Sequence, residues 1–306
     1  MLDVCLLGTG GMMPLPGRHL AAALVRANGR LILLDCGEGT QVAMRARGWG
    51  FRDLDAILLT HLHADHVAGL PGLLLTLANA EKGADEPLTI YGPEPLEAVL
   101  RGLLVLAPRL PYPLRAVVLR GGETFAPGGL ASLAVSCLPL AHDVPCLAYA
   151  LDVPRAPRFN PERARALGVP LADWRRLQRG ETVEAGGRTV ASADVLGPPR
   201  RGLRLVLATD TRPAPALPGF VGGADLLICE GMYGDEADKP TRWTPQHLTF
   251  AEAATIARDG GARRLWLTHY SPALTDPAAY LDRATAIFPA TIAGRDGLTT
   301  TLAFED

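Results

Sequence analysis

The chain has few lysines and no closely spaced cysteines. Lys82 and Lys239 are the only lysines among 306 residues, so arginine carries nearly all of the positive charge. The five cysteines are far apart and form no Cys-x-x-Cys pair. An odd, scattered set predicts reduced thiols, which is typical of a cytoplasmic protein rather than of a secreted disulfide scaffold.

Long apolar runs are also missing. No uncharged apolar segment reaches the roughly 20 residues that a membrane span needs, and the first residues carry no basic region typical of a secretory signal. We therefore expect a cytoplasmic location and no membrane partner. The chain is 48% hydrophobic with a net charge of −2, which argues against disorder. We predict a single folded domain spanning residues 1–306, with enough chain for a large core.

Positive charge is concentrated in one segment. Residues 153–180 contain seven arginines against Glu162 and Asp173, a local net charge of +5. These arginines are Arg155, Arg158, Arg163, Arg165, Arg175, Arg176 and Arg179. On charge alone, a solvated helical surface explains them better than a nucleic-acid contact, but any such contact would fall here.

Short apolar runs alternate with helical stretches along the chain. The expected strands are Leu2–Leu7, Ala21–Val25, Arg30–Leu34, Ala56–Thr60, Leu88–Tyr91, Leu133–Leu138, Leu147–Leu151, Leu203–Ala208, Leu226–Cys229, Leu265–Thr268 and Thr299–Phe304. The expected helices are Gln41–Arg47, His66–Ala80, Pro95–Leu106, Phe250–Arg258 and Pro277–Phe288. This mixture predicts a layered α/β or α+β fold.

The segment 152–196 differs from the rest. It begins with a stretch rich in proline and arginine and has few large apolar residues. Two short helices, Glu162–Leu167 and Ala172–Gln178, and a hairpin-like Glu184–Arg188 are expected within it. We predict that this segment is an insertion leaving the main body.

The most informative run is Thr60-His61-Leu62-His63-Ala64-Asp65-His66, directly after an apolar strand. Imidazole and carboxylate groups are suitable ligands for zinc and similar divalent ions. In an extended segment, His61 and His63 share one face, so both can bind one ion. Asp65 and His66 would then point toward a second ion as the chain turns into a helix. A chance grouping of three of the seven histidines is improbable.

Three further polar residues follow apolar strands. His142, Asp210 and His269 each come at a predicted strand end, where layered α/β proteins collect functional groups. Each alone is more often a hydrogen-bonded structural residue. Because all three lie at strand ends, we expect them to be metal ligands. The carboxylate of Asp210 could bridge two cations.

The chain resembles the ribonuclease Z family of the metallo-β-lactamase superfamily, whose members remove the 3′ trailer of precursor tRNA. The H-x-H-x-D-H run resembles the superfamily signature. Other matching pieces are Leu7–Gly10, Leu34–Gln41, Gly69–Leu74, Ile90–Pro93, His142–Cys146, Gly180–Val183, Val195–Pro199, Asp210–Pro213 and Leu267–Ser271. The resemblance implies a four-layered αβ/βα sandwich with the metals at one edge, between two β-sheets.

The resemblance also assigns residues. It implies two zinc ions, with manganese or magnesium as alternatives. One ion would be held by His61, His63 and His142, the other by Asp65, His66 and His269, with Asp210 bridging them. Asp35 would orient a ligand histidine.

Catalytic roles follow from the same resemblance. Asp65 would orient the attacking nucleophile or accept its proton. His247, supported by Glu230, would stabilise the charged phosphorane or protonate the leaving 3′ oxygen.

The segment 152–196 matches the position of the family's tRNA-binding arm. In the family, the arm of one subunit of a homodimer grips the precursor tRNA that the other subunit cuts. Its seven arginines then become candidate contacts to the tRNA backbone.

Some pieces depart from the family pattern. The family's Pro-Gly-Pro is missing after Gly168-Val169-Pro170. The sequence around Glu230 also differs from the family's, since it is Cys229-Glu230-Gly231-Met232-Tyr233 here. Two alternatives therefore stay open. One is a hydrolase of the same fold acting on a small or cyclic phosphodiester, and the other is a non-catalytic RNA-binding relative.

Overall fold

The computed structural model describes residues 1–239 and 246–305, which form two compact units. The first unit comprises Met1–Val153 together with Leu203–Asp306, and the second comprises Pro154–Gly202. Each unit has its own apolar core and is described separately below.

The first unit contains two seven-stranded sheets. In spatial order, the first sheet consists of β16 (Thr299–Leu302), β1 (Leu2–Gly8), β2 (Ala22–Ala27), β3 (Arg30–Leu34), β4 (Leu54–Leu58), β5 (Leu88–Gly92) and β6 (Leu114–Val118). Strands β3 to β6 run parallel, whereas β16, β1, β2 and β3 pair antiparallel. The parallel strands β4 and β5 are buried along their whole length, which explains their continuous apolar runs.

The second sheet has a similar plan. Its spatial order is β15 (Thr291–Ala293), β14 (Leu265–Thr268), β13 (Leu226–Glu230), β12 (Arg200–Ala208), β9 (Leu147–Arg155), β8 (Ala134–Pro139) and β7 (Thr124–Phe125). Strands β12 to β15 are parallel, so their carboxyl ends meet at one edge. This edge later supplies several polar side chains of the candidate site.

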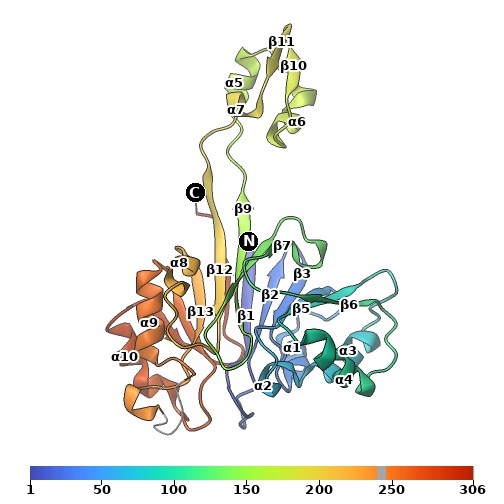
Figure 1. The fold of residues 1–306 in the computed structure, drawn as a ribbon. Helices are drawn as coiled ribbons and strands as arrows, with labels where there is room; N and C mark the ends of the chain where they lie inside the picture. Colours follow the sequence, from blue (N-terminus) through green and yellow to red (C-terminus); the bar gives the residue numbers. More distant parts are fainter. Residues whose placement is uncertain (240–245, 306) are drawn as a thin grey trace. The chain divides into compact units, whose positions relative to one another are not determined.

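Helices cover the outer face of each sheet. Those packed on the first sheet are α1 (Thr40–Arg47), α3 (Leu70–Asn79) and α4 (Leu96–Leu103), and those on the second are α8 (Leu217–Val221), α9 (Phe250–Asp259) and α10 (Leu281–Thr285). Figure 1 shows the two groups on opposite sides of the paired sheets. The predicted four-layered sandwich is therefore confirmed.

The central core lies between the sheets. It joins side chains of the first sheet, such as Val4 and Ile32, to side chains of the second, such as Tyr149 and Leu205. All four are at most 1% exposed. Burial of apolar surface on this scale holds the two sheets together and fixes the edge at which their loops meet.

Four predicted helices are each divided into two elements in the structure. Pro95–Leu106 is α4 followed by a 3₁₀ turn, η1 (Leu104–Leu106), and Ala172–Gln178 lies over η3 (Leu171–Asp173) and α6 (Trp174–Gln178). The expected helix His66–Ala80 is α2 (Ala64–Val67) followed by α3, because Pro71 has no N–H to continue the first helix and Gly69 packs against backbone. A Cβ at Gly69 would lie 2.1 Å from the Gly37 carbonyl oxygen. Likewise, Pro277–Phe288 is a 3₁₀ turn, η5 (Pro277–Tyr280), followed by α10.

The pattern did not predict strands β6, β7 and β15. β6 is an edge strand whose middle residues are exposed, and β7 and β15 have two and three residues. Such strands lack the buried apolar run that identifies a central strand.

The second unit is a small helical and hairpin element. It contains α5 (Pro161–Ala166), η3 (Leu171–Asp173), α6 (Trp174–Gln178), the hairpin of β10 (Val183–Ala185) and β11 (Arg188–Val190), and α7 (Ser192–Val195). Asn160 caps α5, its side-chain oxygen accepting the Arg163 N–H at 3.0 Å. Its core is made of small and medium apolar side chains, including Ala164, Leu177 and Val190.

Two sequence expectations concern the whole chain. Across residues 1–239 and 246–305, no helix is both long and apolar enough to cross a membrane. All five cysteines are free and buried.

Candidate metal centre

Loops at the strand ends bring the predicted ligands together. His61 and His63 follow β4, and Asp65 and His66 lie in the short helix α2. From the second sheet, His142 follows β8, Asp210 follows β12 and His269 follows β14. The seven side chains thus come from the same edge of the first unit.

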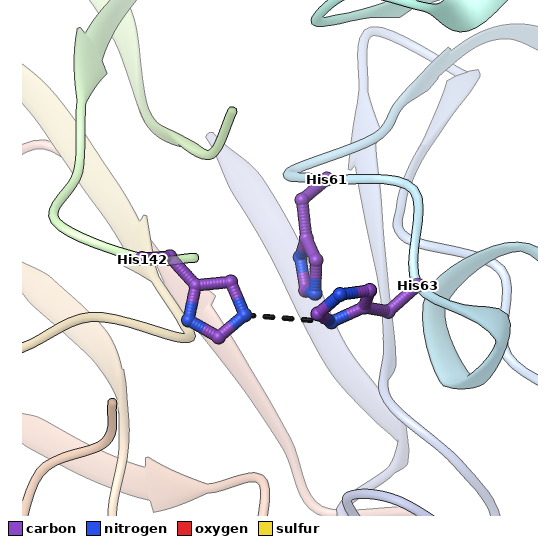
Figure 2. A group of neighbouring side chains, drawn as sticks. All are labelled: His61, His63 and His142. Atoms are coloured by element: carbon purple, nitrogen blue, oxygen red, sulfur yellow. Dashed lines mark hydrogen bonds between the residues drawn. The ribbon is translucent and has the colours of Figure 1, made fainter. Parts of the chain in front are cut away.

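One group consists of three imidazole rings. The ring centroid of His61 is 4.7 Å from that of His63 and 5.0 Å from that of His142. His142 Nε2 lies 3.4 Å from His63 Nδ1. Figure 2 shows the three rings turned toward one another, an arrangement in which one nitrogen of each ring can bind a single cation.

A second group lies beside the first. It comprises Asp65, His66 and His269, whose ligand atoms are also close enough for one ion. His66 Nε2 is 3.1 Å from His269 Nε2, and Asp65 Oδ2 is 3.4 Å from His269 Nε2.

Asp210 lies between the two groups. Its Oδ1 is 3.8 Å from His61 Nε2 and 3.4 Å from His269 Nε2, while its Oδ2 is 3.3 Å from His66 Nε2. One carboxylate therefore faces a histidine of the first group and two of the second. This is the geometry needed for a carboxylate that bridges two cations.

The donor atoms fit divalent cations. His61 Nε2 and Asp210 Oδ2 are buried and make no hydrogen bond with the described residues, although buried polar atoms are normally paired. Facing imidazole nitrogens, such as those of His66 and His269, need a shared proton or cation between them. These His/Asp groups therefore indicate the use of divalent metal ions.

The electrostatics of His61 and Asp210 agree with this, whereas at His66 burial opposes the charge but Asp210 and Asp35 raise the pKa well above its ordinary value. Burial, followed by the neighbouring His66, lowers the pKa of His61 to about 2, so this ring is neutral. Burial opposes ionisation of Asp210, but neighbouring histidines, His269 foremost, hold the pKa of its carboxyl well below its ordinary value. Neutral imidazole and ionised carboxylate are the forms that bind metals.

Asp35 holds His66 in place. Its Oδ2 accepts from His66 Nδ1 at 2.9 Å, and its Oδ1 accepts from the Thr60 backbone N–H at 2.7 Å. Asp35 is 1% exposed. The hydrogen bond on Nδ1 leaves Nε2 of His66 to face the cluster, which is a common way of orienting a ligand histidine.

The backbone is unusual at three of these positions. Asp35, Asp210 and His269 have φ values of 58°, 52° and 57°, in the left-handed region that non-glycine residues seldom adopt. The His269 ring also packs tightly against backbone, since a Cβ at Gly11 would lie 2.7 Å from it. Concentrated local strain is typical of functional sites.

Glu230 and His247 form a pair at the edge of the cluster. Glu230 Oε2 lies 2.9 Å from His247 Nδ1, and Glu230 is completely buried. His247 Nδ1 is also 3.6 Å from Asp210 Oδ1. Burial disfavours the charged ring, but the Glu230 carboxylate raises the pKa of His247 to about 9. Burial in turn raises the pKa of Glu230. The pair thus lies next to the candidate metal centre, with Nδ1 of His247 facing a carboxyl group that favours the protonated ring.

The sequence pattern missed two contacts of the centre. The Met12 backbone N–H donates to Asp65 Oδ2 at 2.7 Å, and Asp143 Oδ1 lies 3.0 Å from His142 Nε2. Asp143 is adjacent to a predicted ligand, which is a signal that could have found it. Met12 acts through its backbone, so its side-chain type carries no such signal.

The predicted RNA-binding arginines lie in the second unit. Six are exposed and Arg155 is half-buried. Arg176 forms ion pairs with Asp173 at 3.1 Å and Glu181 at 3.0 Å. The Arg165 guanidinium lies over the Trp174 ring, 5.4 Å from its centroid.

A family model described as the beta-lactamase superfamily domain matches residues 30–270. Together with the layered fold and the His/Asp cluster, this match places the chain in the metallo-β-lactamase superfamily. Ribonuclease Z of Lachnoclostridium phytofermentans is 45% identical over 306 residues, covering 100% of this chain and 99% of that protein. Ribonuclease Z of Clostridium kluyveri is 46% identical, with 100% of each chain covered. The chain belongs to the ribonuclease Z family.

Solved structures agree on the fold. Human tRNase Z, short form, aligns with a TM-score of 0.68 at 22% identity, covering 99% of this chain and 100% of that one. The metallo-β-lactamase fold protein YhfI from Bacillus subtilis aligns with a TM-score of 0.69 at 19% identity, covering 98% of each. The predicted family and fold are therefore confirmed.

Proposed function

We propose that this chain is a zinc-dependent endoribonuclease that removes the 3′ trailer of precursor tRNA. One observation carries the proposal. A chain that matches proteins named ribonuclease Z at 45–46% identity over its full length also brings together seven His and Asp side chains and an adjacent Glu–His pair.

The proposed ligation follows the two groups. His61, His63 and His142 would hold one ion, and Asp65, His66 and His269 the other, with Asp210 shared between them. Five imidazoles and two carboxylates favour zinc, and manganese or magnesium are the alternatives. When bound, the ions would lower the pKa of the attacking water and polarise the phosphoryl oxygens.

Asp65 would act on the attacking water. Its Oδ2 accepts the Met12 N–H and lies 3.6 Å from His66 Nε2. A carboxylate held at such a point can orient a water and accept its proton.

His247 would act on the leaving group. Because Glu230 engages Nδ1, Nε2 is the nitrogen left to donate a proton to the leaving 3′ oxygen. The product would keep a 3′-hydroxyl on the tRNA side. The buried Glu230 carboxylate would favour the protonated ring needed for this step.

We further propose that the second unit is the tRNA-binding arm. Its arginines would contact the RNA backbone by charge and shape rather than by reading bases. The protein would act in the cytoplasm as a homodimer, with the arm of one subunit gripping the tRNA that the other cuts.

The test is incubation of the purified chain with a precursor tRNA, with and without a chelator, followed by mapping of the cut. A cut directly after the last nucleotide of the mature tRNA body, lost on chelation, is expected. Chelator-sensitive cleavage of bis-p-nitrophenyl phosphate without any precursor cleavage would favour a small-diester hydrolase instead. Precursor binding with no cleavage of either substrate would favour a non-catalytic RNA-binding relative.

A further inference from the structure

A small hollow lies beside the candidate metal centre. Its volume is about 150 Å³, and its lining includes Tyr233, Gly234, Asp238, Ser271 and Tyr280. Pockets for whole small-molecule ligands usually measure roughly 300–1,000 Å³. This hollow is therefore of a size for one ring system rather than for a complete nucleotide.

Two loops that follow neighbouring strands build the hollow. The loop after β13 continues from Glu230, and the loop after β14 continues from His269. Backbone hydrogen bonds join them: Gly231 N–H donates to Thr268 O at 2.8 Å, and Ser271 N–H donates to Met232 O at 3.1 Å. The hollow is thus held rigidly against the residues of the metal centre.

Aromatic rings form part of the lining. Tyr233 and Tyr280 are both half-buried, so each presents part of its ring. Tyr280 lies directly on the backbone at Gly234, where a Cβ would be 2.4 Å from its ring. A glycine at this position is required for the ring to lie there.

The polar groups of the lining disfavour a phosphate. Asp238 is an exposed carboxylate in the lining. Asp235, in the same loop but outside the lining, is paired with Arg283 at 2.9 Å. Lys239, the one cation among the described residues of this loop, is paired with Glu236 at 3.0 Å and Glu252 at 2.9 Å. A ligand for this hollow should be uncharged and flat, and it should donate hydrogen bonds.

We propose that this hollow binds an unpaired nucleobase that carries an amino group. The inference rests on the proposed function of cutting RNA. Aromatic side chains are common stacking platforms for single-stranded bases, and a carboxylate accepts from an exocyclic amine. Adenine, guanine and cytosine carry such an amine, whereas uracil does not.

The position of His247 identifies which nucleotide this is. The Tyr233 ring centroid is 6.4 Å from that of His247. In the proposed function, His247 donates a proton to the leaving 3′ oxygen. The nucleotide that carries this oxygen is the last one of the tRNA body. Its base therefore enters the hollow, and Tyr233, Tyr280 and Asp238 become specificity-determining residues.

The experiment uses four precursor tRNAs that differ only in this base, and kcat/KM is measured for each. The wild-type chain should cut the uracil precursor about tenfold more slowly than the others, the scale on which one base contact discriminates. Asp238→Asn should reduce this ratio to about twofold, because the carboxylate that attracts the amine is gone. Glu236→Gln, a neighbouring charge change outside the lining, should keep the wild-type ratio.

The aromatic wall is tested separately. Tyr233→Leu should lower kcat/KM for all four precursors about tenfold through loss of stacking, while Tyr233→Phe keeps the ring and the wild-type values. Metal content measured on each variant controls for damage to the centre. Equal rates for the four precursors in the wild type, or the same ratio in Asp238→Asn as in Glu236→Gln, would overturn the proposal.

A binding measurement tests the base site without depending on cleavage, and so distinguishes it from the proposed function. Fluorescein-labelled RNA tetranucleotides with each of the four bases at the 3′ end mimic the product and need no cleavage. Fluorescence anisotropy should give the weakest binding for uracil. If no precursor is cut but this order holds, the proposed function fails and the base site stands. If precursors are cut and binding shows no base order, the base site fails alone.

Discussion

The candidate metal centre and the second unit differ in how they hold the side chains to which we assign a function. In the centre, His61, His66 and Asp210 are at most 2% exposed, and each is fixed by packing or by a buried partner. In the second unit, Arg163, Arg175 and Arg179 are exposed on short helices or beside them. Fixed groups suit chemistry that requires exact placement, whereas exposed arginines suit contacts to a phosphate backbone.

Substitutions in the two regions should therefore have different effects on the activity. A change in the centre should alter metal content or turnover, because its groups act together on few atoms. A change in the second unit should alter substrate affinity and its salt dependence, because each arginine adds one charge among several.

The largest effect is expected for Asp210→Ala. This carboxylate faces both ligand groups, so its loss should remove or misplace the cations. Turnover should fall by roughly 10⁴-fold or more, the scale seen when a central catalytic group is removed. Metal analysis should show fewer ions per chain. Wild-type metal content together with wild-type turnover would remove Asp210 from the site.

His247→Ala should have the next largest effect. Turnover should fall by about 10²–10⁴-fold, the range for a general acid, while metal content stays at the wild-type level. His19→Ala is the matched control, because His19 is bonded to Asp296 outside the cluster. Equal turnover in the two variants would show that His247 donates no proton in the reaction.

Asp35→Asn should weaken metal binding by about 10–100-fold, as is usual when the partner of a ligand histidine is changed. Asparagine tolerates the positive φ, but its single oxygen cannot accept from both Thr60 and His66. Titration with a competing chelator measures the change. Asp53→Asn, at an exposed turn, should keep wild-type affinity; a loss of equal size there would point to general destabilisation.

The smallest effect per residue is expected in the second unit. Replacing Arg163, Arg175 and Arg179 with Gln should raise KM for precursor tRNA and reduce the slope of log affinity against log salt by about one per lost phosphate contact. The control is the same change at Arg109, Arg115 and Arg120, which are exposed in the first unit. Identical salt slopes in both triple variants would contradict the proposed arm.

The sequence predicted the centre better than its surroundings. The H-x-H-x-D-H run places four candidate ligands by local geometry alone, and His142, Asp210 and His269 were predicted to join them because each follows an apolar strand. The joining of the loops after β13 and β14 depends on sheet order and register, which are non-local. For the same reason, the sequence did not predict the Met12 contact to Asp65 or the hollow lined by Tyr233.

The central claim is that seven side chains hold two cations sharing one carboxylate. Anomalous X-ray scattering from crystals of the zinc-loaded chain measures this directly. We expect two zinc peaks per chain, one among His61, His63 and His142 and one among Asp65, His66 and His269, with Asp210 contacting both. A single peak, or a pair of peaks that Asp210 does not join, would contradict the account.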